Sequence, residues 1–314
     1  MKQTTSFLGS SLLLALVMFS GFYGEAKTEN LPTDITLVGS TPGDELIKSL
    51  LRIPPTTKVD FIRWNLALTG SISGKKTFAL KINYGEGQPN TPGFINGGEK
   101  KSIRGEYNIS HSKGSINGDV YHLKSDKLPT EILMIKLNDN IFHLLTPQKQ
   151  LMIGNGGWSY TLNRKEPLSN VSTDLPALTM SSGLASDTAQ QIAFEGRTPC
   201  ADIAREINIT VGQDCYKLKW YLVLNKDPRT LKPTTYTLKR TGHRQSDITG
   251  KWTIKKGISN PNVRVCQLDP DKPEESISLL LGDDNVAFFL DKNNRLFIGN
   301  EDFSYTLNRD RKSK

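Results

Sequence analysis

The sequence predicts an all-β protein made of two tandem small antiparallel β-barrels joined by a flexible linker. The first observation is an internal repeat, because residues 105–164 and 250–309 align without a gap at an offset of 145, with 21 of the 60 paired positions identical. The second is a series of short apolar runs separated by turn signals such as Asn-Gly. Short antiparallel strands must cover their edges, so we expect each copy to close into a barrel.

The repeat is densest at its end, where LMIGNGGWSYTLNR at 151–164 is matched by LFIGNEDFSYTLNR at 296–309. Each copy therefore resembles a β-meander closed by the same last strand. A chain of 314 residues with 36% apolar content is long enough for two domains that each bury a core.

Residues 1–26 have the features of a secretory signal peptide. Lys2 precedes an apolar run at 7–19, and small residues follow up to Ala26. The alternative is a buried apolar helix. We expect an exported protein of the cell envelope, either periplasmic or secreted. No cysteine occurs in the first 199 residues to carry an N-terminal lipid anchor, and no other apolar run reaches the roughly 18 to 20 residues of a membrane span.

The charge balance indicates few partner classes. The chain has 40 Lys plus Arg against 32 Asp plus Glu, and it ends in a basic tail at 311–314. No basic patch is interleaved with aromatic residues as in nucleic-acid-binding modules, so no nucleic-acid partner is expected. Weak attraction to anionic membrane surfaces is the one partner class that the charge supports.

The first copy is expected to begin after an N-terminal segment at 27–57. That segment contains one helical pattern, with a cap at 41–45 and an apolar stripe at Leu46, Ile47, Leu50 and Leu51, and Pro54 ends it. We expect this helix to lie across a barrel mouth. The first barrel is assigned to 58–164, with short strands expected at 59–70, 75–85, 105–110, 118–123, 132–137, 140–146, 150–153 and 158–163.

Residues 165–190 lack strand and helix periodicity and predict the linker, followed by the second barrel at 191–310. Three residues of the first copy match residues of the second at an offset of 142: Gly70 with Gly212, Leu80 with Leu222, and Asn83 with Asn225. Asp60 and Arg63 then fall opposite Asp202 and Arg205. The default interpretation of this Asp-x-x-Arg pair is a structural ion pair, and the alternative is a ligand contact.

The second copy also resembles a known family. The residues that carry the resemblance are Phe194-Glu195-Gly196 with Thr198-Pro199-Cys200-Ala201-Asp202, the run Ile207 to Val211, Gly250-Lys251-Trp252-Thr253-Ile254, and the closing Ser304 to Arg309. In this order they are similar to the N-terminal domain of the NlpE copper-resistance lipoprotein family. The resemblance implies a lipocalin-like barrel and a role in copper tolerance, surface sensing or envelope stress. The first copy looks like a diverged member.

The resemblance also indicates a candidate site motif, formed by Pro199, Cys200, Asp202 and Arg205. The family has a second cysteine where this chain has Ile203, and a C-x-x-C pair suits Cu(I) or redox chemistry. Cys200 is thus the candidate metal ligand, with copper as the candidate cofactor. Any two of the three cysteines could pair in an oxidising compartment, and we expect Cys215 with Cys266, which leaves Cys200 free.

No catalytic constellation is present, since the chain lacks a phosphate-binding loop, H-E-x-x-H and G-x-S-x-G. We therefore expect a non-enzymatic envelope protein linked to copper tolerance or envelope stress. The alternatives are a lipocalin-like carrier of a small apolar ligand and a structural or adaptor protein that meets envelope partners.

Overall fold

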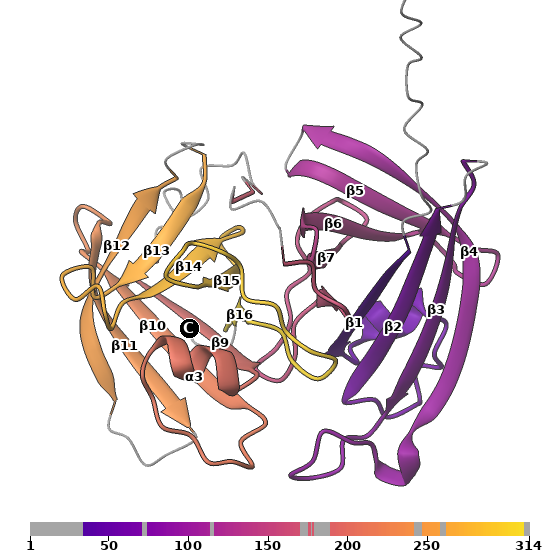
Figure 1. Cartoon of the computed structure of the whole chain (residues 1–314), viewed down its shortest axis with the longest axis horizontal. Helices are drawn as coiled ribbons and strands as arrows, with labels where there is room; N and C mark the ends of the chain where they lie inside the picture. Colours follow the sequence, from indigo (N-terminus) through magenta and orange to yellow (C-terminus); the bar gives the residue numbers. More distant parts are fainter. Residues whose placement is uncertain are drawn as a thin grey trace, which may run out of the picture.

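The computed structural model contains two closed eight-stranded antiparallel β-barrels, one after the other in the chain (Figure 1). It describes residues 34–70, 74–113, 116–169, 175–176, 178, 189–241, 247–257 and 262–310. The predicted all-β class and the tandem barrels are confirmed. The expected signal peptide at 1–26 and the basic tail at 311–314 lie outside the described residues.

The first barrel is an up-and-down meander in which each strand pairs with the next and β8 pairs with β1. Its elements are β1 (Ile35–Pro42), α1 (Glu45–Leu50), β2 (Phe61–Gly70), β3 (Lys76–Gly85), the 3-10 turn η1 (Ile95–Gly97), β4 (Glu99–Lys113), β5 (Asn117–Lys124), β6 (Ile132–Asn138), β7 (Ile141–Leu145) and β8 (Thr161–Arg164).

The second barrel repeats this order and closes through the pairing of β16 with β9. Its elements are β9 (Gln191–Thr198), α3 (Ala201–Glu206), β10 (Leu218–Lys226), β11 (Pro233–Thr241), β12 (Ile248–Lys256), β13 (Arg264–Leu268), β14 (Ile277–Leu281), β15 (Val286–Leu290) and β16 (Thr306–Arg309).

The first barrel begins earlier in the chain than the sequence pattern indicated. β1 falls inside the expected N-terminal segment at 27–57, yet it supplies the strand on which the barrel closes. The expected short helix is present as α1, with the Asp44 carboxylate accepting a hydrogen bond from the Ile47 N–H at 3.1 Å. α1 inserts Ile47 and Leu51 into the barrel core.

The offset of 142 for the early part of the repeat is wrong. The run Gly39-Ser40-Thr41-Pro42 ends β1, and Gly196-Arg197-Thr198 ends β9 and is followed by Pro199, each run just before the short helix of its barrel. In both copies a tryptophan of the next strand donates its indole N–H to the threonine, Trp64 to Thr41 at 2.9 Å and Trp220 to Thr198 at 2.8 Å. Leu222 therefore corresponds to Leu66 and not to Leu80.

Each barrel interior is filled by large side chains that alternate along the strands. In the first barrel, Trp64, Leu66 and Leu68 on β2 are fully buried, and Tyr160 and Phe142 pack against the same core. In the second, Trp220, Leu222 and Leu224 occupy the corresponding positions on β10. These side chains supply the hydrophobic stabilisation of each barrel.

A third hydrophobic cluster joins the two barrels, which lie side by side (Figure 1). It is formed by the outer faces of β5–β7 and β13–β15, so residues paired by the offset of 145 meet across it. Both members of each of these pairs belong to the cluster: Val120 and Val265, Ile135 and Leu280, Leu145 and Leu290, and Leu151 and Leu296. β7 and β15 are buried along their whole length because one face lines a barrel and the other lines this contact.

Hydrogen bonds across this contact obey the same pairing. The Gly154 N–H donates to Asn308 Oδ1 at 2.8 Å, and the Gly299 N–H donates to Asn163 Oδ1 at 2.8 Å. The hydroxyls of Ser159 and Ser304 lie 2.6 Å apart, and those of Thr161 and Thr306 lie 2.9 Å apart. The barrels are thus related by an approximate two-fold axis, as in an isologous dimer.

The expected linker at 165–190 is not only a spacer. Among its described residues, Leu178 is buried in the interbarrel cluster and its carbonyl accepts a hydrogen bond from the Asn117 N–H at 3.2 Å. Leu175 packs against the same cluster.

Candidate functional site

The candidate site is a cavity of about 860 Å³ at the α3 end of the second barrel. Its apolar wall is formed by α3 and the adjoining strands, with Ile203, Ile207, Ile277, Phe289 and Phe297. All five belong to the core cluster of the second barrel or pack against it, so this wall of the cavity is the end of the barrel core.

α3 is positioned by its own sequence and by a disulfide. Ala201 and Ala204 favour a helix, Asp202 lies in the first turn and Arg205 in the last, where their charges suit the helix dipole. The helix ends at Glu206 with Ile207 as its C-cap, and Asn208 then adopts a left-handed backbone with φ of 52°. Because Ile203 and Ala204 are buried, this short helix presents its apolar face to the barrel end.

The structure pairs Cys200 with Cys215 and leaves Cys266 as a buried thiol, so the expected Cys215–Cys266 pair is wrong. The bond joins the start of α3 to the segment that enters β10. Cys266, on β13, belongs to the core of the second barrel, and burial raises the pKa of its thiol to about 12.

Cys200, the candidate metal ligand, is therefore occupied by a disulfide and is almost fully buried. In the part of the chain that the structure describes, no group of three or more His, Cys, Asp or Glu side chains is arranged to hold a metal ion. Ile203, which replaces the second cysteine of the family pattern, faces the cavity instead.

The remaining motif residues have structural positions. Pro199 connects β9 to α3. Asp202 and Arg205 form an exposed pair on α3 at 3.5 Å. Asp60 and Arg63 are not their counterparts, because Asp60 accepts a hydrogen bond from the Gly87 N–H and Arg63 pairs with Asp302 of the other barrel.

The rim of the cavity carries charges of both signs, but most acidic groups already have partners. Glu274 pairs with the Lys292 ammonium at 3.0 Å, and Glu206 accepts a hydrogen bond from the Lys292 N–H. Asp291 pairs with Arg295 at 2.8 Å. Lys255 and Lys256, by contrast, are exposed at the rim. The rim therefore favours an anionic group near these two lysines.

Sequence reasoning missed this cavity. Ile277 and Phe289 are apolar strand residues indistinguishable by pattern from core residues, and the cavity depends on how α3 and the loops at 269–276 and 291–297 meet. The one available signal was the position of α3 after Pro199, which places apolar helix residues at a barrel end.

No known family model, curated protein or solved structure matches the chain. Membership of the NlpE family therefore stays a prediction. None of the described helices is long and apolar enough to cross a membrane.

Proposed function

We propose that this chain is an exported, non-enzymatic binding protein whose second barrel takes up a small amphipathic anion with an alkyl tail, such as a medium-chain fatty acid. The observation that carries the proposal is the cavity of about 860 Å³ beside α3. Its volume falls within the roughly 300–1,000 Å³ of small-molecule sites.

The chemistry of the walls suggests the class of ligand. An alkyl tail would lie against Ile203, Ile277 and Phe289 and remove apolar surface from water. A carboxylate head would remain at the rim near Lys255 and Lys256. The proposal is thus a form of the carrier hypothesis, with the ligand at one end of the second barrel. The first barrel offers no such place in its interior, because its own side chains fill it.

The proposal is tested by calorimetric titration of the mature protein with dodecanoate and, for comparison, with dodecyltrimethylammonium. We expect dodecanoate to bind more tightly, because the two tails are equal and the heads differ in sign. Phe297→Ala should weaken both by removing part of the shared apolar wall. Lys255→Ala/Lys256→Ala should weaken dodecanoate alone.

The matched control is Lys81→Ala/Lys100→Ala, which removes two exposed lysines from the first barrel. It should leave dodecanoate binding unchanged if the effect is local. Equal affinities for the anion and the cation, or no heat with either, would contradict the proposal.

A second candidate is Cu(I) capture with a role in copper tolerance or envelope stress sensing, as the NlpE resemblance implies. The observation that favours it is the proximity of Cys200 and Cys215, whose Cα atoms lie 6.0 Å apart. In the reduced protein, Cys215 would supply the second thiolate that the motif itself lacks at Ile203, and thiolates select Cu(I).

Equilibrium dialysis against a Cu(I) chelator tests this candidate. The reduced protein should compete with the chelator, the oxidised protein should not, and either Cys200→Ser or Cys215→Ser should abolish binding. Cys266→Ser serves as the control because that thiol is buried and takes no part in the disulfide. Failure of the reduced wild-type protein to compete would eliminate the metal candidate.

A further inference from the structure

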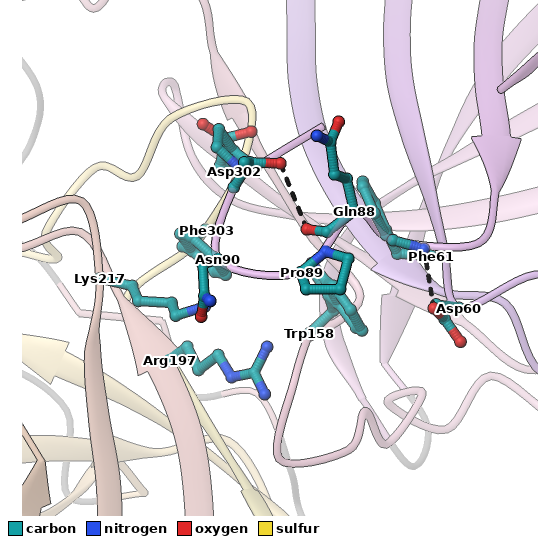
Figure 2. A pocket seen from close by; sticks show the side chains of 13 residues that line it. Asp60, Phe61, Gln88, Pro89, Asn90, Trp158, Arg197, Lys217, Asp302 and Phe303 are labelled. Carbon is teal, nitrogen blue, oxygen red and sulfur yellow. Dashed lines mark hydrogen bonds between the residues drawn. The ribbon is translucent and has the colours of Figure 1, made fainter. Parts of the chain in front are cut away.

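A separate pocket of about 220 Å³ lies between the two barrels, on the side where the loop at 86–98 of the first barrel faces β9 of the second (Figure 2). Trp158 and Phe303 both line it, and these residues are paired by the offset of 145. The pocket therefore lies close to the approximate two-fold axis, and the loop at 86–98 of the first barrel supplies the part of its lining that has no counterpart from the second.

The wall from the first barrel is aromatic. Phe61 stacks on Phe94 with ring centroids 4.1 Å apart and on Trp158 with centroids 4.7 Å apart. Pro89 on the loop lies over the same region (Figure 2). A planar apolar group is the ligand feature that such a surface accommodates.

The wall from the second barrel carries two cations, Arg197 and Lys217, beside Asp302 and Phe303. Figure 2 shows the side chains of Arg197 and Lys217 extending toward the loop at Asn90 and toward Trp158. The Arg197 guanidinium lies 5.4 Å from the centre of the Trp158 ring, and its Nε is buried with no hydrogen-bond partner among the described residues. A buried N–H donor without a partner favours the binding of a ligand that can accept its hydrogen bond.

Comparison of the two copies shows where this charge differs. Arg197 occupies the position of Ser40, whose hydroxyl donates to the Glu301 carbonyl at 2.7 Å, and Lys217 occupies the position of Phe61. The segment facing Arg197 is Gly156-Gly157, which replaces Glu301-Asp302 and leaves space for the guanidinium. The position next to Ser40 is thus filled by packed groups, whereas the equivalent position in the second barrel presents the two cations Arg197 and Lys217.

The acidic groups around the pocket have interactions of their own. Asp302 pairs with Arg63, and Asp60 accepts a hydrogen bond from the Gly87 N–H at 2.7 Å. Glu195, two residues before Arg197 on β9, lies against Gly156, and its charge also acts on the Arg197 guanidinium. An incoming anion would therefore meet Arg197 and Lys217 as its closest cationic groups in the pocket.

We propose that this pocket binds a small aromatic carboxylate, with the carboxylate on Arg197 and Lys217 and the ring against Trp158 and Phe303. The pocket is smaller than most drug-sized sites, which suits a single ring. A guanidinium with two parallel donors matches a carboxylate, and a stacked ring fills the apolar half. This site is distinct from the cavity beside α3.

The test is a titration of the mature protein with benzoate and with its neutral analogue benzamide. The fluorescence of Trp158 is monitored during the titration. The other three tryptophans, Trp64, Trp220 and Trp252, are buried in the barrel cores, so a change in iodide quenching reports on Trp158. We expect benzoate to protect Trp158 and benzamide to bind at least about tenfold more weakly, because it lacks the charge.

Arg197→Gln should weaken benzoate binding at least about tenfold, and Lys217→Gln should weaken it by a smaller factor. Arg104→Gln, at an exposed arginine of β4, is the matched control. Phe297→Ala should leave benzoate binding intact, which separates this site from the one beside α3. Equal binding of benzoate and benzamide, unchanged affinity in Arg197→Gln, or no binding to the wild-type protein would overturn the proposal.

Discussion

His143 is fully buried where the barrels meet, and its ring lies edge-on to that of Phe288 with centroids 5.6 Å apart. Phe288 is the residue at the equivalent position of the second copy. The imidazole is satisfied by the Thr161 hydroxyl and the Met152 carbonyl, each at 2.9 Å. Burial lowers the pKa of His143 to about 4.

This burial predicts a pH dependence of stability with a defined sign. The unfolded chain protonates His143 near pH 6.5, whereas the folded chain keeps it neutral down to about pH 4. Stability from this residue is therefore complete above about pH 6.5 and is lost as the pH falls toward 4, by about 3 kcal/mol in all. Denaturant unfolding of the wild-type protein and of His143→Phe between pH 7 and 4 measures it.

The difference between the two proteins is the informative quantity. Asp283 is partly buried, and desolvation raises its pKa to about 6, so its protonation acts in the opposite direction over part of the same range. His143→Phe leaves Asp283 in place and copies the residue found at Phe288. A free-energy difference that stays constant with pH would mean that His143 is not held neutral.

At the scale of elements, α3 depends on the Cys200–Cys215 disulfide. The bond closes a loop with a sequence separation of 15 residues, which corresponds to about 3 kcal/mol of stabilisation in the chain-entropy account. We expect Cys200→Ser/Cys215→Ser to unfold at a lower denaturant concentration than the oxidised wild-type protein and to bind dodecanoate more weakly. Unfolding curves with and without a reductant check this.

The reductant provides an internal control. It should destabilise the wild-type protein toward the level of the double variant and leave the variant unchanged, since the remaining thiol, Cys266, is buried and unpaired. Equal stability of the oxidised wild-type protein and the variant would show that packing of Ile203 alone holds α3.

The same elements show how far the sequence could go. The offset of 145 correctly relates β4–β8 to β12–β16, because connections of equal length and a shared closing strand preserve the register. The offset of 142, applied earlier in the chain, was wrong because β1 contains Gly39, Ser40 and Pro42 and resembles a polar segment, so the first strand was not recognised. The Gly-x-Thr-Pro run, which occurs in both copies with a tryptophan on the next strand, was the signal for the correct alignment of the two copies. It could not be recognised from the sequence, because it depends on the Trp64–Thr41 hydrogen bond between residues far apart in the chain.

At the scale of the whole molecule, the interbarrel contact accounts for the strongest part of the repeat. Gly154 and Asn163 are retained with Gly299 and Asn308 because each glycine N–H is satisfied by the asparagine of the other barrel. A Cβ on Gly154 would lie 2.2 Å from the Trp158 carbonyl oxygen, so only glycine fits. A continuous apolar strand such as 286–290 was the sequence signal that both of its faces are buried. Which surface would cover the outer face depends on tertiary packing.

We expect the two barrels to unfold as one cooperative unit, because the closing strand of each contributes both to its own core and to the contact. Calorimetry of the wild-type protein should give a single transition with equal calorimetric and van't Hoff enthalpies. Asn163→Ala/Asn308→Ala leaves two glycine N–H donors unsatisfied, at a cost of about 1–3 kcal/mol each, and should lower this transition or split it into two. Asn65→Ala, at an exposed position of β2, should leave it unchanged. Two separate transitions in the wild-type protein would mean that the barrels are independent, and the two-fold contact would then have to be weaker than its buried hydrogen bonds indicate.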